Sequence, residues 1–245
     1  MELLRRIEEE KISSTCGLFG SDINDIEKEI KGLIDFTYNT VDNTIDFDFF
    51  DIRGTVLLYG SPGLGKTSVM KNCMAYALER YSVDCYELLT TDIVESELGK
   101  TTKNLSEALK EFERLDKGIL FIDELDRLCV DRMSDEISEL KRMLIELMFY
   151  FDNLKIKDKK VLLSCTNVVD QIDKAFLRRF SILEEINKPT VDDLLDFVNI
   201  CMEKASFSGK IYSLPSEILT FDDVKRTFRN AILQHKDISD FLMRR

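Results

Sequence analysis

Hydrophobic residues along the chain follow two alternating patterns. Four short segments have the length and apolar content of strands, and four longer ones show the three- or four-residue spacing of one face of a helix. The strand segments are 55–59, 83–89, 118–122 and 161–165, and the helical ones are 23–37, 69–77, 105–115 and 137–151. Strands that alternate with helices indicate an α/β fold, a doubly wound parallel sheet with helices on both faces.

The pattern changes after Pro189. Thr190-x-x-Asp193 and Thr220-x-x-Asp223 each match a capping box, and each precedes apolar residues at helical spacing. No further strand is obvious beyond this point. The sequence therefore predicts three parts: an N-terminal helix and linker at 1–20, an α/β nucleotide-binding domain at 21–188, and a small helical lid at 189–245.

Composition indicates a soluble cytoplasmic protein. Hydrophobic residues make up 44% of the 245 residues and charged residues 33%, and no apolar run approaches the roughly 20 residues of a membrane span. Six of the first ten residues are charged, and they lack the apolar core of a signal peptide. The six cysteines form no C-x-x-C pair and are interpreted as reduced core residues. The net charge of −12 repels phosphate backbones, so a nucleic-acid partner is disfavoured and no membrane partner is expected.

A phosphate-binding loop follows the first strand segment. Residues 60–67 fit the pattern G-x-x-x-x-G-K-[ST] at every fixed position. Glycines let backbone N–H groups point at phosphate oxygens, the lysine reaches the β- and γ-phosphates, and the threonine hydroxyl holds Mg²⁺. A glycine-rich turn that binds nothing is disfavoured, since strand, loop and helix come in the required order. The predicted ATP-binding residues are Gly60, Ser61, Pro62, Gly63, Leu64, Gly65, Lys66, Thr67 and Ser68.

Polar residues also end the next two buried strand segments, at the sheet edge where ligands of α/β folds bind. Asp123 is predicted to hold Mg²⁺ together with Thr67, and Glu124 to polarise the attacking water. Asn167 can hydrogen-bond that water or the γ-phosphate. Each alone would be an ordinary turn residue. Their combination with a phosphate loop favours nucleotide hydrolysis.

These motifs together carry a family resemblance. The order GSPGLGKT, ILFIDELD, LLSCTN and AFLRRF, followed by a helical lid, resembles the AAA clade of AAA+ ATPases over roughly residues 20–235. The resemblance implies a five-stranded parallel sheet with a small all-helical lid, a ring that is usually a hexamer, and ATP bound between neighbours. The chain is similar to small stand-alone bacterial ATPases, some of which are paired with a protease.

The resemblance also implies roles for individual residues. Asn167 matches the first sensor, and Arg178 and Arg179 match the arginine fingers that reach a neighbour's γ-phosphate. The family usually separates those arginines by Pro-Gly, so the adjacent pair leaves open which one reaches the nucleotide. A solvated basic pair or salt bridges between sheet and lid are the alternatives. No second sensor arginine is clear, although Arg226 lies near the start of the last predicted helix.

The stretch 91–105 resembles the first pore loop of the family, which grips a threaded peptide. Glu97 occupies the place of the usual aromatic residue, while Leu98 and Gly99 remain. An acidic residue there favours basic segments or indicates that nothing is threaded, and a plain surface loop is the alternative. The mixed charges from Asp126 to Asp135 match a second pore loop or a solvated face.

Two functions follow from these observations. The first is a ring-forming Mg-ATPase that remodels or unfolds a protein substrate, with a partner protein that recruits the substrate. The second is a nucleotide-dependent assembly switch without threading, which Glu97 favours. A nucleic-acid motor or loader is opposed by the charge and by the absence of a basic stripe with interleaved aromatic residues.

Overall fold

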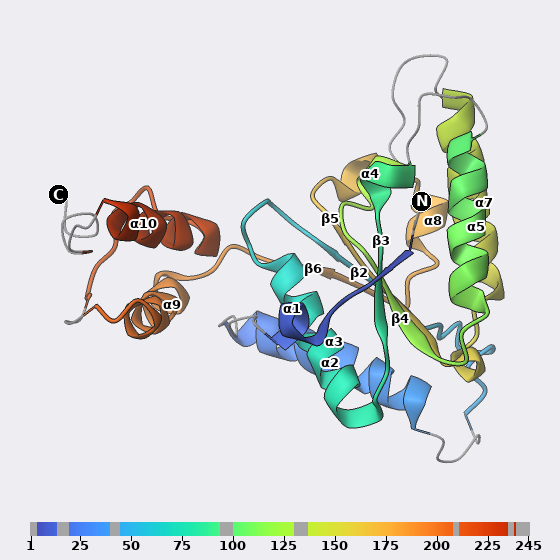
Figure 1. Ribbon diagram of the computed structural model, residues 1–245, viewed down its shortest axis with the longest axis horizontal. Helices are drawn as coiled ribbons and strands as arrows, with labels where there is room; N and C mark the ends of the chain where they lie inside the picture. Colours follow the sequence, from blue (N-terminus) through green and yellow to red (C-terminus); the bar gives the residue numbers. More distant parts are fainter. Residues whose placement is uncertain are drawn as a thin grey trace.

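A computed structural model describes residues 4–13, 20–39, 45–93, 100–129, 137–207, 211–234 and Ile238. Its centre is a six-stranded sheet in the order β1-β3-β4-β5-β2-β6, with helices on both faces (Figure 1). The strands are β1 (Leu4–Arg6), β2 (Thr55–Tyr59), β3 (Cys85–Leu88), β4 (Gly118–Ile122), β5 (Lys160–Thr166) and β6 (Ile182–Glu185). The helices are α1 (Glu9–Ser13), α2 (Ser21–Tyr38), α3 (Lys66–Tyr81), α4 (Thr90–Ile93), α5 (Lys100–Glu113), α6 (Asp126–Cys129), α7 (Ile137–Asn153), α8 (Lys174–Leu177), α9 (Val191–Lys204) and α10 (Phe221–Leu233).

Five of the six strands run parallel, as the sequence predicted. β2 pairs with β5 and β6, and β4 pairs with β3 and β5, each in parallel register. This arrangement confirms the doubly wound parallel sheet. It also brings the carboxyl ends of β2, β4 and β5 together at one edge, where the predicted chemical residues follow.

The prediction of helix at the very start of the chain is wrong for β1. Leu4–Arg6 pairs antiparallel with β3, and Leu4 is buried. Arg5 and Arg6 form ion pairs with Glu87 and Asp84. The open edge of β3 supplies backbone partners and opposite charges, which outweigh the helical tendency of a short charged segment.

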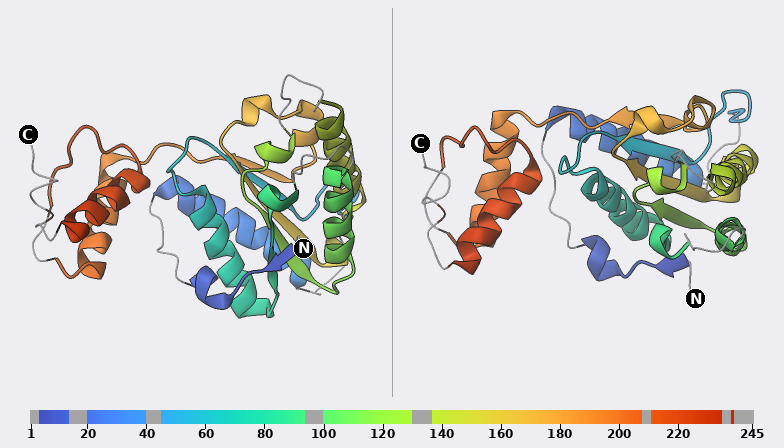
Figure 2. Two further views of the ribbon diagram at one scale, coloured as in Figure 1. Left: turned by 45° about the horizontal axis from the view of Figure 1, so that its top comes forward. Right: turned by 90° about the horizontal axis from the view of Figure 1, so that it is seen from above.

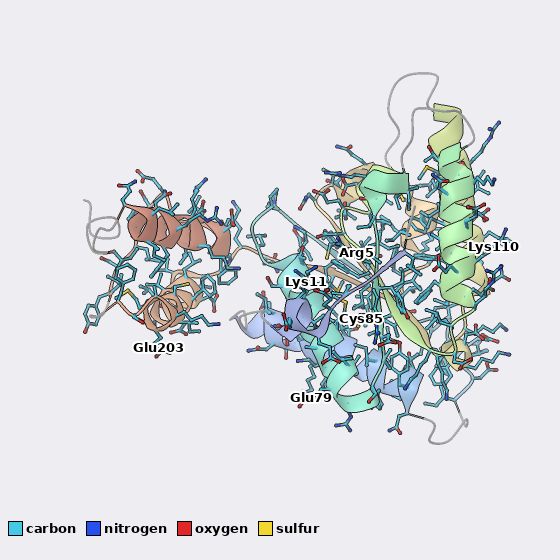
Figure 3. All side chains as sticks on the ribbon, in the orientation of Figure 1. Arg5, Lys11, Glu79, Cys85, Lys110 and Glu203 are labelled. Carbon is cyan, nitrogen blue, oxygen red and sulfur yellow. The ribbon has the colours of Figure 1, made fainter. Side chains whose placement is uncertain are left out.

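Alternate residues of the buried strands face different layers of helices. Val56 and Leu58 pack with α2 and α3, whereas Leu57, between them, packs with α5 and α7. This period of two explains why strands covered on both faces are continuous apolar runs in the sequence. Charged residues on the outer faces of helices, such as Glu79, Lys110 and Glu203, point to solvent (Figure 3).

The predicted capping boxes begin the two long helices after Pro189. The side chain of Thr190 accepts from the backbone N–H of Asp193, and that of Thr220 accepts from the N–H of Asp223. Each aspartate accepts in return from the backbone N–H of its threonine. α9 and α10 pack on each other to one side of the sheet, opposite α5 and α7 (Figures 1 and 2).

Two other predictions from composition can be compared with the structure. Cys73, Cys85, Cys129 and Cys165 are buried, as expected of core residues, while Cys16 lies outside the described residues. Within the described part of the chain, none of the helices is both long and apolar enough to cross a membrane. The cytoplasmic location stays a prediction.

Candidate active site

The phosphate loop joins the end of β2 to the start of α3, and its shape depends on glycine. Gly60, Gly63 and Gly65 have φ angles of 140°, 79° and 94°, a region that residues with a Cβ rarely adopt. A Cβ on Gly60 would also lie 2.6 Å from the carbonyl oxygen of Ile186. The loop can therefore curl against the segment after β6 only with glycine at this position.

The same loop touches the lid. The backbone N–H of Asp222, in the first turn of α10, donates to the carbonyl oxygen of Gly63 at 3.3 Å. A Cβ on Gly63 would lie 3.1 Å from both Thr220 Oγ1 and Asp222 Cβ. The first turn of α10 thus packs directly against the phosphate loop.

Lys66 is held at the mouth of the loop. Its side chain is buried, and Nζ donates to the carbonyl oxygens of Gly60 at 2.8 Å and Ser61 at 2.9 Å. Burial lowers the pKa of Lys66, and the nearby acidic groups, including Asp123 and Asp126, oppose this shift. The loop therefore places a partly desolvated cation where phosphate oxygens would bind.

Thr67 and Asp123 come together from α3 and the end of β4. The Thr67 hydroxyl donates to Asp123 Oδ2 at 3.1 Å. Hydroxyl and carboxylate oxygens suit Mg²⁺, which proteins usually bind through one or two carboxylates together with substrate phosphates and water. No group of three or more His, Cys, Asp or Glu side chains that could hold a metal occurs among the described residues. The pair fits a cation that arrives with the nucleotide.

Glu124 has an unusual backbone and a close partner. Its φ is 51°, and its N–H donates to Asp123 Oδ1 at 3.0 Å. Its Oε2 lies 2.6 Å from Arg127 Nε, in an ion pair in which both side chains are about two fifths exposed (44% and 41%). The candidate catalytic carboxylate is therefore engaged by a cation one helical turn later in the chain.

The stretch that matched a second pore loop begins at this same edge of the sheet. Asp126 Oδ1 accepts from the Thr166 hydroxyl at 2.8 Å, which ties the end of β4 to the end of β5. Asp126 is therefore not a solvated surface charge, whereas Arg127 is exposed, as the alternative of a solvated face expects. Asp131, Arg132 and Asp135 lie outside the described residues.

These segments enclose a cavity of about 280 Å³. Its walls come from the phosphate loop and the start of α3, the ends of β4 and β5, and the first turns of α10. The predicted residues among them are Pro62, Gly63, Gly65, Lys66, Thr67, Ser68, Asp123, Glu124 and Asn167, and the others are Cys165, Thr166, Phe221, Asp222 and Lys225. The carbonyl oxygens of Gly60 and Ser61 accept hydrogen bonds from Lys66, while Leu64 is buried in the core.

Five cavity residues were not among the predicted site residues, and Lys225 is the cation among them. The lid arginine considered instead, Arg226, pairs with Asp223 at 2.6 Å and is 64% exposed. Lys225 lies four residues after the buried Phe221, and its Nζ is 5.7 Å from the ring centroid of Phe197. Its position one turn after a buried aromatic residue at the start of a capped helix was the available signal.

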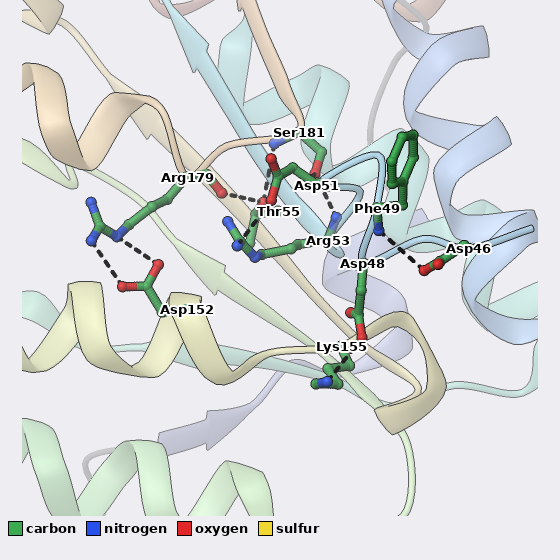
Figure 4. A network of polar contacts seen from close by, with 10 residues as sticks. All are labelled: Asp46, Asp48, Phe49, Asp51, Arg53, Thr55, Asp152, Lys155, Arg179 and Ser181. Atoms are coloured by element: carbon green, nitrogen blue, oxygen red, sulfur yellow. Dashed lines mark hydrogen bonds and ion pairs between the residues drawn. The ribbon is translucent and has the colours of Figure 1, made fainter.

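The two candidate finger arginines differ sharply. The guanidinium of Arg179 binds the carboxylate of Asp152 on α7 through two hydrogen bonds, at 2.9 and 2.8 Å (Figure 4). Arg178 is the C-cap residue directly after α8 and is exposed. The partner of Arg179 lies within the sheet domain, so the expected alternative of a salt bridge to the lid does not describe it. Neither arginine lines the cavity of its own chain.

The candidate pore-loop residues Glu97, Leu98 and Gly99 lie outside the described residues.

Comparison with protein families identifies the class of this site. Residues 56–188, more than half of the chain, match the model of the ATPase family associated with various cellular activities (AAA). This chain belongs to the AAA family. The family predicted from the motifs, a class of nucleotide-binding ATPases, is thereby confirmed. The bacterial origin stays a prediction.

Individual AAA relatives match along most of this chain. It is 29% identical to the 26S proteasome regulatory subunit 6A of Saccharomyces cerevisiae over 174 residues, 69% of this chain and 39% of that protein. It is 31% identical to the ATPase family gene 2 protein of Schizosaccharomyces pombe over 188 residues, 74% of this chain and 22% of that protein. The proteasome-activating nucleotidase of Methanococcus maripaludis is 31% identical over 159 residues, 63% of this chain and 38% of that protein. The matches thus span between a fifth and two fifths of these relatives.

A solved structure supports the same fold. A chain in the Escherichia coli MS115-1 HORMA:CdnC:Trip13 complex superposes with a TM-score of 0.74, covering 96% of this chain and 91% of that one. The two are 17% identical. At this identity the likeness shows the AAA fold alone.

Proposed function

We propose that this chain hydrolyses Mg-ATP in a hexameric ring of its own copies and uses the energy to remodel a protein substrate with a partner protein. The observation that carries the proposal is the single cavity that joins the phosphate loop, Asp123 with Glu124, Asn167 and the lid helix α10. Proteasome ATPases among the relatives support a protein substrate and a protease as the kind of partner.

Each residue has a physical role in this proposal. The loop N–H groups and Lys66 hold the phosphates, since the two carbonyl oxygens that Lys66 now contacts are weaker partners than phosphate oxygens. Thr67 and Asp123 hold Mg²⁺, which when bound neutralises charge on the β- and γ-phosphate oxygens. Glu124 takes the proton of the attacking water, and Asn167 orients that water.

Arg178 is the better candidate for the residue that reaches a neighbouring copy. Arg179 is already bound to Asp152, whereas Arg178 is exposed at the end of α8. A guanidinium supplied by another copy would stabilise the charge that spreads over the γ-phosphate in the transition state. A ring satisfies this geometry, because each copy then gives one arginine and receives another.

Complementation between two inactive variants tests the shared site. Glu124→Gln should lower ATP turnover at least about 100-fold while ATP binding persists, because the amide keeps the shape and loses the base. Arg178→Ala should also be inactive. Mixed together, the variants should regain activity several-fold above either alone, since an Arg178→Ala site can face the intact Arg178 of a Glu124→Gln copy.

Lys174→Ala, a change of an exposed cation on the same helix α8, should keep wild-type activity. A mixture no more active than its components would rule out Arg178 as the shared residue. Full turnover by Glu124→Gln would remove Glu124 from the reaction.

A nucleotide-dependent assembly switch is the second candidate, favoured by Glu97 at the place of the usual aromatic residue. Remodelling requires that a protein substrate change the rate of ATP hydrolysis. If Leu98→Ala removes that response and leaves the basal rate unchanged, remodelling through this loop is supported. If unfolded proteins never alter the rate, the switch is the better account.

A further inference from the structure

An apolar groove of about 380 Å³ runs between the two lid helices. Phe197 and Phe228 lie in it, and Ile232 and Leu233 at the end of α10 are 50% and 72% exposed. Every charged residue that lines the groove is a cation: Lys204, Lys225 and Arg229. A surface of this kind suits an aromatic segment that also carries carboxylates.

The same chain carries such a segment at residues 45–51, which we name the acidic aromatic loop. Phe49 and Phe50 are 77% and 62% exposed, with their ring centroids 5.1 Å apart in an edge-to-face arrangement. The loop also holds three aspartates, Asp46, Asp48 and Asp51.

An internal hydrogen bond and two ion pairs to neighbouring residues hold the acidic aromatic loop in shape (Figure 4). Asp46 Oδ1 accepts from the N–H of Phe49 at 3.1 Å, and Asp48 pairs with Lys155 at 2.9 Å. Asp51 lies 3.5 Å from Arg53 yet is 82% exposed. The two phenylalanines are therefore presented to solvent by an ordered turn that keeps acidic groups beside them.

The groove and the loop cannot meet within one copy. The lid lies at one end of the molecule, and the loop lies at the other end with α7 (Figures 1 and 2). A contact between them must join different surfaces of two copies. Such head-to-tail contacts generate rings when the rotation closes.

Each of these surfaces adjoins one part of the proposed shared site: the loop adjoins the arginine segment, and the groove adjoins the phosphate cavity. On the loop side, the N–H of Arg53 donates to Ser181 Oγ at 2.7 Å, and Thr55 Oγ1 donates to the carbonyl oxygen of Arg179 at 2.8 Å. The loop and the Arg178–Arg179 segment therefore belong to one network (Figure 4). On the lid side, Lys225 lines both the groove and the phosphate cavity.

We propose that the acidic aromatic loop of one copy docks in the lid groove of the next copy. The same contact brings the arginine segment of the first copy toward the phosphate cavity of the second, because each docking surface adjoins one half of the site. This inference rests on the proposed ring and names the surfaces that build it.

Site-directed cross-linking between two preparations tests the docking. One preparation carries Phe50→Cys and the other Leu233→Cys, both with Cys16→Ser and Cys201→Ser. Background reaction should be low, because burial raises the pKa of the Cys73 and Cys85 thiols to about 12. With a non-hydrolysable ATP analogue and a mild oxidant, covalent dimers should form in the mixture and in neither preparation alone.

Lys110→Cys, on the exposed face of α5, replaces Phe50→Cys as the control and should give no dimer with Leu233→Cys. Dimers from Phe50→Cys alone would indicate a symmetric contact and overturn the proposal. Absence of dimers in the mixture would also overturn it. If Glu124→Gln and Arg178→Ala still complement each other in that case, the shared site stands and the copies meet through another surface.

A second measurement compares two apolar pairs of similar exposure. Phe49→Ser with Phe50→Ser should raise the concentration needed for assembly at least 10-fold in sedimentation experiments, with nucleotide affinity unchanged. Ile145→Ser with Phe149→Ser removes two residues of α7 that are 64% and 68% exposed and should change assembly less than 2-fold. The reverse order of effects would place the contact on α7 and overturn docking through the loop.

Discussion

The ion pair between Glu124 and Arg127 is the residue-level feature that most directly affects the proposed chemistry. A carboxylate that accepts from a guanidinium is less available to take a proton from water. The pair is 2.6 Å long and about two fifths exposed on both sides, so its net strength is that of a surface ion pair. Glu124 can therefore leave it at small cost.

Arg127→Gln should raise the rate of ATP hydrolysis about 1.5- to 5-fold, the range that corresponds to the strength of an exposed ion pair. ATP affinity should not change, because Arg127 does not line the cavity. Steady-state kinetics with a separate binding titration measure the two effects. Arg127→Lys should stay near wild type, and a rate loss of more than 10-fold in Arg127→Gln would mean that the arginine orients the carboxylate.

The sequence placed Asp123 and Asn167 beside the phosphate loop correctly, because their positions follow from chain order. Asp123 and Asn167 follow parallel strands, so their approach to the phosphate loop results from the topology. The place of Lys225 depends instead on how α10 packs against the phosphate loop, and its signal in the sequence is only its position one turn after Phe221. The ion pair from Arg127 to Glu124 has a common spacing of three residues, but that spacing does not single out a pair at the site.

Among the elements, α10 contributes both to the stability of the lid and to the nucleotide cavity, and the two contributions can be separated. Its Thr220 cap holds the first turn, which brings Phe221 and Asp222 to the cavity, and Lys225 lines the cavity from the next turn. α9 has an equivalent cap at Thr190, but its residues lie away from the cavity. The two caps form a matched pair.

Thr220→Ala and Thr190→Ala should each destabilise the protein by about 0.5–2 kcal/mol, the usual loss when an N-cap hydroxyl is removed. Only Thr220→Ala should also weaken nucleotide binding, because only that turn touches the phosphate loop. Thermal unfolding and a nucleotide titration measure the two properties. Equal binding losses in both variants would show that the lid acts through general stability alone.

Helices and strands were predicted correctly where a segment is long and periodic. They were not predicted where pairing with a distant strand sets the conformation. The capping boxes predicted both lid helices, because side-chain hydrogen bonds to the first turn are local. β1 has only three residues, and its conformation is set by β3, which is distant in sequence. β6 was not located either, since the sequence ILEE has no continuous apolar run.

At the scale of the whole molecule, the proposed site is complete only between copies. Neither Arg178 nor Arg179 lines the cavity of its own chain. Hydrolysis per copy should therefore depend on how many copies are assembled. This dependence is a property of the assembly rather than of any residue.

ATP turnover per mole of protein should rise at least about 10-fold from nanomolar to micromolar concentration, because trans arginines accelerate phosphoryl transfer by large factors. Arg178→Ala should show a flat and low dependence. Activity assays alongside sedimentation measure this relation. A constant specific activity across the range in which assembly changes would contradict a site shared between copies.

The outermost strands of the sheet also bear on how the chain avoids unwanted association. β1 covers the side of β3 with only three residues, two of them arginines, and β6 carries Glu184 and Glu185 at the opposite margin. Short, charged margins are poor templates for backbone pairing with a foreign strand. Removal of residues 1–8 would uncover the backbone of β3 and leave the sheet with an open edge. That truncation should reduce solubility first, because exposed strands stack as in amyloid, before it affects ATP chemistry.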